Sequence, residues 1–325
     1  MAYYNIYFSP FCNDCGEDSS ILRITCNYHF MKKLTGSVLL LLSFCLAASS
    51  QNVTGKLKFE QGQMLEILLQ TKTTIAQQAM GQAIDFNVDA SGTHFYKVTN
   101  TTEDNHTLNH TVKRITFSFD GMGQKQSFDS DKPKDISGPF GKPVKEMLEK
   151  KYDVIIDPYG KVMMAMPESF ASAGSDSRMA IINSMMKDVL DVVNPPQKGK
   201  GSFFRVIPEK DGGVAVGDAW TETGETTTEK FENAYAISAI TDTTIVVDFA
   251  STSTTVTKAE MMGNETTTTM NNKSTGKIIL DRATGIMKEK TITTESNGNT
   301  EASFGTLPVT SKTTTVITVK PVVQN

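Results

Sequence analysis

The stretch Thr244-Ile-Val-Val-Asp-Phe249 predicts the fold most directly, because apolar side chains occupy every second position from Ile245 to Phe249. A period of two places those side chains on one face of a β-strand and the others on the opposite face. The same alternation recurs at Ile84-Asp-Phe-Asn-Val-Asp89 and at Ile115-Thr-Phe-Ser-Phe-Asp120. These stretches therefore predict half-buried strands, each with one face on a core and the other in water.

Threonine extends this pattern through the C-terminal third of the chain, where residues 221–325 contain 28 Thr among 105 residues. Threonine is β-branched and favours pleated, solvated surfaces. These threonines are interleaved with Ile, Val, Phe and Met. The exposed faces of long antiparallel strands therefore explain them better than a mucin-like stalk does.

Turn signals separate the expected strands. Asp89-Ala-Ser-Gly92, Asp157-Pro-Tyr-Gly160 and Asp281-Arg-Ala-Thr-Gly285 each combine an Asp, which bonds the following backbone, with a Gly, which adopts positive φ. We therefore expect a hairpin turn at each of these places. The sequences around the last two turns are similar to each other. This similarity predicts two related β halves at residues 51–166 and 203–325.

A short helix is expected near the end of the first half, and a longer one between the halves, where residues 167–202 form a helix and linker. Pro143 suits the first turn of a short helix. Apolar residues at helical spacing over residues 175–193 predict a longer helix, which Pro195-Pro196 would end. Because an amphipathic helix must bury its apolar stripe, we expect a β-dominated α+β fold, with long antiparallel sheets in two related halves covered by central helices.

The N-terminal region has the pattern of an export signal. Residues 31–50 combine a basic start with an apolar run and a small-residue end. The apolar run is shorter than the roughly 20 residues that cross a bilayer. We therefore expect a cleaved signal peptide, with Ser50 as its last residue and Gln51 as the mature N-terminus. Residues 1–30 are interpreted as a mis-called extension.

Cysteine placement bears on the same question, since all four cysteines lie within the first 45 residues. Cys45 ends the apolar run, but the residue before it is Phe44 rather than a small one, so lipid anchoring at Cys45 is the weaker alternative. The mature chain then has no thiol and no disulfide. Its expected location is periplasmic or on the outer surface, with no transmembrane helix in the mature chain.

Composition excludes one class of partner. The net charge of the 325 residues is −4, which provides no basic surface for a phosphate backbone. We therefore expect no nucleic acid partner.

Residues with catalytic or metal-binding chemistry form no recognised constellation. His106 and His110 have the i, i+4 spacing that binds zinc on a helix, but the polar residues 100–110 predict a solvated hairpin tip instead. We expect no cofactor, no metal site and no identifiable catalytic residue. Paired carboxylates such as Asp153 and Asp157 leave no spacing signature, so a hydrolase acting on an envelope polymer remains the alternative.

Methionine is concentrated in the middle of the chain. Thioether side chains fill cores, line adaptable apolar binding sites, or bind Cu(I) in the company of His and Cys. Core filling is the plainest explanation, and the copper motifs are missing from the sequence. The candidate ligand-lining residues are Met163, Met166, Met179 and Met186.

Short motifs over most of the chain carry a family resemblance. They are Gly141-Lys-Pro-Val-Lys145, Tyr152-Asp-Val-Ile-Ile-Asp-Pro-Tyr-Gly-Lys-Val162, Val206-Ile-Pro-Glu-Lys210 and Val216-Gly-Asp-Ala-Trp220. In these motifs the chain resembles a family of uncharacterised exported, β-rich proteins of Bacteroidetes-type bacteria, which form a domain of unknown function. The resemblance implies an envelope location and a β-rich fold, and it implies no activity.

The function that these observations favour is non-enzymatic. We expect an exported cell-envelope protein that binds an apolar small molecule or an envelope protein partner in a concavity between sheet and helices.

Overall fold

A computed structural model of the chain describes residues 52–323, except 80–81, 122, 171–186, 262–263 and 304. The chain divides into two units, Met1–Ser49 and Ser50–Asn325, and every described residue belongs to the second. The expected signal peptide, its cleavage point at Ser50 and Gln51, and Cys45 lie outside the described residues, as do Met179 and Met186.

The second unit is built on one antiparallel sheet of 12 strands. The order across the sheet is β6-β5-β3-β2-β1-β12-β11-β10-β9-β8-β7, and β4 pairs with the far end of β3. The strands are β1 (Met64–Ala79), β2 (Gln82–Thr101), β3 (His106–Gly121), β4 (Gln124–Asp129), β5 (Lys151–Ile156), β6 (Val162–Met166), β7 (Ala219–Glu225), β8 (Glu229–Ile240), β9 (Thr244–Met261), β10 (Asn264–Asp281), β11 (Met287–Ala302) and β12 (Gly305–Pro321).

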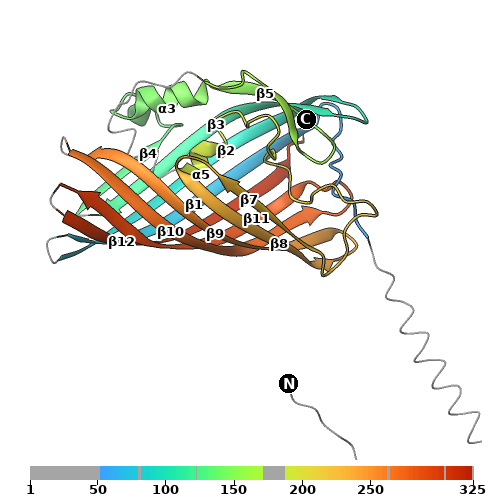
Figure 1. Ribbon diagram of the computed structural model, residues 1–325. Coiled ribbons are helices and arrows are strands. Elements are labelled where there is room, and N and C mark those ends of the chain that lie inside the picture. The colour runs from blue at the N-terminus through green and yellow to red at the C-terminus, as the bar shows by residue number, and fades with distance from the viewer. Residues whose placement is uncertain are drawn as a thin grey trace, which may run out of the picture. The chain divides into compact units, whose positions relative to one another are not determined.

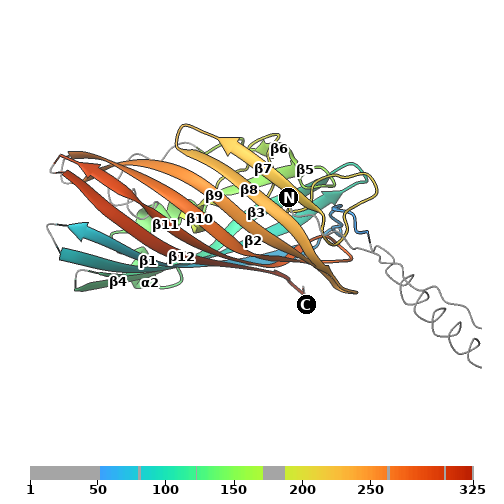
Figure 2. The same ribbon diagram turned by 60° about the horizontal axis from the view of Figure 1, so that its bottom comes forward.

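The first and last long strands meet at the middle of this sheet, as Figures 1 and 2 show. β1 pairs with β12 from Leu65 opposite Pro321 to Gln77 opposite Val309. The prediction of long antiparallel strands is confirmed. The expected two halves, however, are two sets of strands within a single sheet, because the long β1–β12 register joins them.

The sheet is curved, and its two faces differ (Figure 1). We call the face toward α5 (Lys187–Asp191) and residues 192–218 the inner face, and the opposite one the outer face. Inner positions alternate with outer ones along every strand. On β1 the inner side chains Leu65, Ile67 and Leu69 are fully buried. Cross-strand neighbours on the same face include Val319 and Ile317 of β12.

Residues 175–186 of the expected longer helix lie outside the described residues. The described helices are short and do not cover the sheet in the way that the sequence predicted. They are α2 (Pro133–Ile136), α3 (Gly141–Leu148) and α5. α3 contains Pro143 in its first turn, as expected, and packs on β3, while α5 contacts β1 and β2. Among the helices of the described residues, none is long and apolar enough to span a membrane.

Two of the three expected turns are present. Gly160 and Gly285 adopt φ of 79° and 71° after β5 and β10. The turn expected at residues 89–92 is wrong, because those residues continue β2. Gly92 serves close packing instead, since a Cβ there would lie 2.6 Å from His94 Nε2 and 2.8 Å from Val189 Cγ1.

Candidate functional site: a pocket on the inner face

A pocket of about 400 Å³ lies between the inner face of the sheet and the segments packed upon it. Its volume falls within the range typical of small-molecule sites. The floor comes from β1 and β9–β12, and the wall from the end of α5 and the segment after residue 201. The lining residues are Leu69, Asp191, Val192, Ser202, Phe203, Arg205, Val206, Phe249, Ser274, Met287, Lys290, Ile292, Thr294, Thr315 and Ile317.

The apolar floor of the pocket follows from the register of the strands. Phe249 of β9 faces Gly276 of β10, which in turn faces Ile292 of β11. A Cβ at Gly276 would lie 3.0 Å from Ile292 Cγ1, so the glycine lets Ile292 pack closely against β10. Phe249 and Ile292 line the pocket on either side of this glycine.

Charged groups at the pocket lie close to other side chains. The Lys290 ammonium lies 5.5 Å from the centroid of the Phe249 ring, within cation–π range. Arg205 Nε is 3.8 Å from Glu222 Oε1. The pocket thus combines apolar side chains with nearly as many hydroxyl and charged ones, a composition that suits a ligand with both apolar and polar parts.

An aromatic row continues from the pocket to the edge strand β7. The Trp220 and Tyr235 rings are stacked, with centroids 5.3 Å apart, and Tyr235 lies at the same centroid distance from Phe249. Burial raises the pKa of Tyr235 to about 12, so its hydroxyl is neutral at physiological pH. The row extends the aromatic part of the inner face from Phe249 of the pocket toward β7.

A polar cluster is buried beside the pocket wall. His94 Nδ1 and His110 Nε2 share a hydrogen bond of 3.1 Å. Tyr152 donates its hydroxyl proton to the Val192 carbonyl oxygen at 3.1 Å, so at 2.9 Å the Tyr96 hydroxyl donates to the Tyr152 oxygen. Because Val192 lines the pocket, this chain of hydrogen bonds ties the pocket wall to β2 and β5.

Both histidines of the cluster are neutral at physiological pH. Burial lowers the pKa of His94 to about 4, and burial together with the nearby His94 lowers the pKa of His110 to about 3. The sequence-based expectation of a solvated tip at His106 and His110 is wrong for both. The tip is confined to residues 102–105, and both histidines point inward from β3. Their alternation with Leu108 and Val112 was the signal that could have revealed this.

The other residues singled out in the sequence do not gather at this pocket. Met163 and Met166 are exposed on the edge strand β6. Asp153 accepts a hydrogen bond from the Asn109 amide at 2.8 Å, whereas Asp157 accepts backbone N–H groups of its own turn. The two carboxylates are thus engaged separately. Within the described residues, no three His, Cys, Asp or Glu side chains are grouped as metal ligands.

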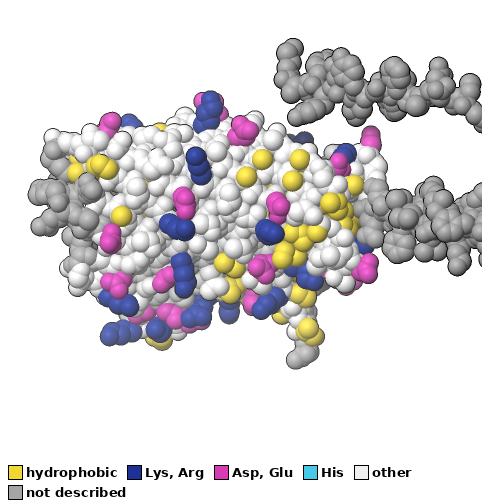
Figure 3. Space-filling view, turned by 90° about the horizontal axis from the view of Figure 1, so that it is seen from below, with side chains coloured by type: hydrophobic (Ala, Val, Ile, Leu, Met, Phe, Trp, Pro, Cys, Tyr) yellow, Lys and Arg dark blue, Asp and Glu magenta, His cyan; other side chains and the backbone are white. Residues whose placement is uncertain are grey.

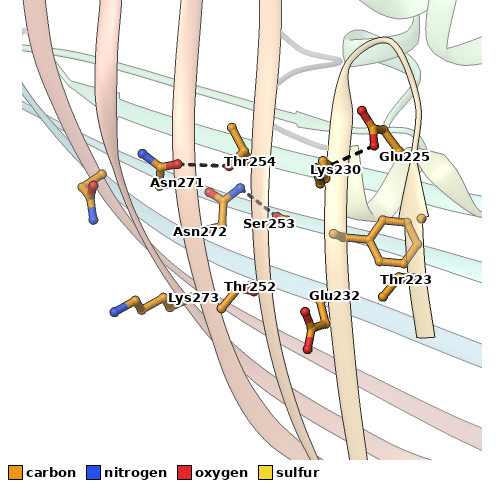
Figure 4. Close-up of a pocket in the computed structure, with 13 residues that line it drawn as sticks. Thr223, Glu225, Lys230, Glu232, Thr252, Ser253, Thr254, Asn271, Asn272 and Lys273 are labelled. Atoms are coloured by element: carbon orange, nitrogen blue, oxygen red, sulfur yellow. Dashed lines mark hydrogen bonds and ion pairs between the residues drawn. The ribbon is translucent and has the colours of Figure 1, made fainter. Parts of the chain in front are cut away.

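A second concavity, of about 540 Å³, lies over strands β7–β11 (Figure 4). Hydroxyl, amide and charged side chains predominate in it, and several of them bind one another. Lys230 Nζ is 3.6 Å from Glu225 Oε2, and Thr254 donates to Asn271 Oδ1 at 3.1 Å. The second concavity lies over strands alone, whereas the inner pocket lies between the sheet and the segments packed upon it, so the inner pocket is the better candidate.

The fold and the pocket define a strand-dominated protein with one large antiparallel sheet and a ligand-sized cavity on its inner face. The chain belongs to a family of unknown function (DUF6263), which it matches over residues 103–287. This range includes β3 through β10 and most of the pocket wall. The family has no assigned activity.

Other comparisons give distant likenesses. No curated protein matches the chain. Lipovitellin, in a structure of its lipid–protein interactions, is similar with a TM-score of 0.41 and 8% identity, over 82% of this chain and 26% of that one. The COG4313 outer membrane channel from Pseudomonas putida F1 gives a TM-score of 0.21 and 6% identity, over 82% of this chain and 98% of that one. Neither likeness is close enough to establish a shared fold.

Proposed function

We propose that this chain is an exported envelope protein that binds an apolar ligand, or an apolar segment of a protein partner, without catalysing a reaction. The observation that carries the proposal is the inner-face pocket, with its apolar floor and its ligand-sized volume of about 400 Å³. The pattern of an export signal at residues 31–50 supports the envelope location.

The pocket suits binding better than chemistry. Its floor sets apolar side chains such as Phe249, Ile292 and Ile317 beside hydroxyl groups and Lys290, and no histidine is among the residues that line it. The histidines nearest to its wall are hydrogen-bonded to each other inside the core, with their pKa values lowered. Burying an apolar ligand of this size would release water from both surfaces, which is the main driving force of such binding.

A cavity-filling variant tests the proposal. Ile292→Trp adds a large ring on the floor of the pocket, and we expect it to lower the affinity for the uncharged apolar dye N-phenylnaphthylamine by about ten-fold or more. Thr293→Trp is the matched control, because Thr293 is the next residue on β11 and faces outward. Dye fluorescence and native mass spectrometry of the purified protein provide the measurements.

Equal affinity of the wild type and of Ile292→Trp for the dye would contradict the proposal, provided that the variant retains the far-ultraviolet circular dichroism of the wild type. The expected contribution of Met163 and Met166 to ligand binding remains a separate proposal. Because both are exposed on β6, Met163→Ser and Met166→Ser test it without disturbing the core.

A further inference from the structure

The inner face of the five central strands, β1 and β9–β12, is almost free of charge. The structure describes most of the side chains at the inner positions of these strands. Among those described, the charged one is Lys290. The remaining inner positions hold aliphatic, aromatic, hydroxyl and amide side chains, or glycine. An ionic ligand lying along this face would therefore meet few groups that could neutralise it.

The outer face of the same strands is charged, so the difference is not one of overall composition. Figure 3 shows Lys, Arg, Asp and Glu side chains scattered over the molecule as seen from below. The outward-facing charged residues of these strands include Glu66, Lys72, Asp248, Lys258, Glu265, Lys273, Lys277, Asp281, Glu289, Glu295, Glu301, Lys312 and Lys320.

The inner face changes in character along the strands. At the pocket, large apolar residues such as Phe249, Ile292 and Ile317 lie beside Lys290 and a few hydroxyl groups. Farther along the same strands, short hydroxyl and amide side chains replace them. We call this region the hydroxyl face, and it consists of Thr73, Ser251, Ser253, Asn272, Ser274, Thr294, Ser296, Ser311 and Thr313.

Pairs of side chains on the hydroxyl face bind one another across the strands. Ser274 and Thr294 hydroxyls lie 2.8 Å apart, and those of Thr73 and Thr313 lie 2.9 Å apart. A hydroxyl has one donor and two acceptor sites. One bond within a pair therefore leaves one donor and three acceptor sites for a ligand. Ser274 and Thr294 also line the pocket, which makes the two regions continuous.

We propose that the ligand is an uncharged amphiphile with a polyhydroxylated, saccharide-like head group. This inference rests on the proposed function. The apolar tail occupies the pocket, while the head group lies on the hydroxyl face and exchanges hydrogen bonds with paired hydroxyls. Sugar hydroxyls are both donors and acceptors, as are those of the hydroxyl face, and neither the head group nor the hydroxyl face carries a charge.

Two probes with the same tail test the inference. Dodecyl maltoside has a sugar head group, whereas a dodecyl polyoxyethylene ether has an uncharged head group with acceptors but almost no donors. Below their micelle concentrations, we expect the full chain to bind the maltoside about ten-fold more tightly. Isothermal titration calorimetry measures both affinities.

Variants assign this preference to the hydroxyl face. Thr294→Val removes a hydroxyl at nearly constant size, and we expect it to reduce the preference for the maltoside several-fold while the ether binds as before. Thr293→Val is the control, because its side chain faces outward on the same strand, and it should retain the full preference.

The outcomes separate the two proposals. If the wild type binds both probes equally, or if Thr294→Val keeps the full preference, the saccharide inference is overturned and the apolar pocket stands. If the wild type binds neither probe nor N-phenylnaphthylamine, the proposed function fails, and the inference fails with it.

Discussion

His94 and His110 are polar residues within an otherwise apolar core. Each ring uses one nitrogen in their shared hydrogen bond, and His94 Nε2 and His110 Nδ1 are buried with no hydrogen-bond partner among the described residues. In either tautomer, one of these atoms is an unsatisfied donor and the other an unsatisfied acceptor. Such groups destabilise a fold by roughly 1–3 kcal/mol each, so the histidine pair contributes little to the stability of the core. Burial also lowers the pKa values of both histidines, which makes the core sensitive to acid.

Stability should therefore fall on mild acidification. The pKa of each histidine is lowered in the folded protein, to about 4 for His94 and about 3 for His110, while the unfolded chain has ordinary histidines near 6.5. Below pH 6.5 the unfolded state therefore binds more protons than the folded state. We expect the free energy of unfolding to be constant above about pH 7 and to fall by on the order of 2–4 kcal/mol by about pH 5.

Urea unfolding at a series of pH values measures this effect. The window above about pH 5 separates the histidines from carboxylates such as Asp129, whose pKa is lowered mainly by its hydrogen bond with Arg114 and which titrates in stronger acid. His94→Phe should flatten part of the pH dependence, and the remainder belongs to His110 and to His106, whose pKa burial also lowers. A wild-type free energy of unfolding that stays constant down to about pH 5 would show that the pair is not held neutral.

Tyr152 provides a second prediction at this scale. Its hydroxyl links the Tyr96 hydroxyl to the Val192 carbonyl of the pocket wall. Tyr152→Phe leaves both groups buried without this partner, so we expect a loss of roughly 1–3 kcal/mol in unfolding free energy and weaker binding of N-phenylnaphthylamine. Tyr159→Phe, in the turn after β5, is the control and should change neither. Unchanged dye affinity in Tyr152→Phe would separate this hydrogen bond from the pocket.

At the scale of strands and turns, sequence patterns predicted local structure well and three-dimensional neighbours poorly. Alternation identified strands such as β9, and the Asp and Gly pairs identified the turns that end at Gly160 and Gly285. Gly92 was misjudged, because its role is to make room for His94 and Val189, and that contact depends on packing between distant segments.

The pocket could not be predicted from the sequence for the same reason. Its floor joins residues of β1, β9, β10, β11 and β12, and its wall comes from residues 191–206. Each strand alone predicts which side chains share a face. Which strands are neighbours, and in what register, depends on pairings such as that of Leu69 with Ile317, residues far apart in the chain.

Gly276 of β10 shows how one position can control a strand pair. A Cβ there would lie 2.1 Å from the Thr291 carbonyl oxygen of β11. Gly276→Ala should therefore push β10 from β11, lowering the unfolding free energy by roughly 1–3 kcal/mol. Its neighbour Thr275 faces outward, so Thr275→Ala serves as the control. Chemical unfolding and hydrogen exchange of the β10 and β11 amides measure the effect, and equal exchange in both variants would contradict it.

At the scale of the whole sheet, the central β1–β12 pair joins two sets of strands, one from each half of the chain. β1–β6 follow one another on one side of that pair and β7–β12 on the other. Buried residues of both sets belong to one hydrophobic cluster. Because a shared core couples the elements that line it, the two sets should unfold together rather than as separate domains.

A destabilising substitution in one set of strands should therefore shift the unfolding transition of the other set by the same amount. Ile67 of β1 is fully buried near the middle of the sheet, and the single tryptophan, Trp220, lies on β7, the edge strand of the other set. We expect Ile67→Ala to lower the unfolding free energy by about 2–5 kcal/mol. Trp220 fluorescence and far-ultraviolet circular dichroism should report the same shifted transition. Ile278→Ala on β10 is the reciprocal variant and should shift both signals alike. If Ile67→Ala moved the circular dichroism transition but left that of Trp220 in place, the halves would be independent domains that merely share an edge.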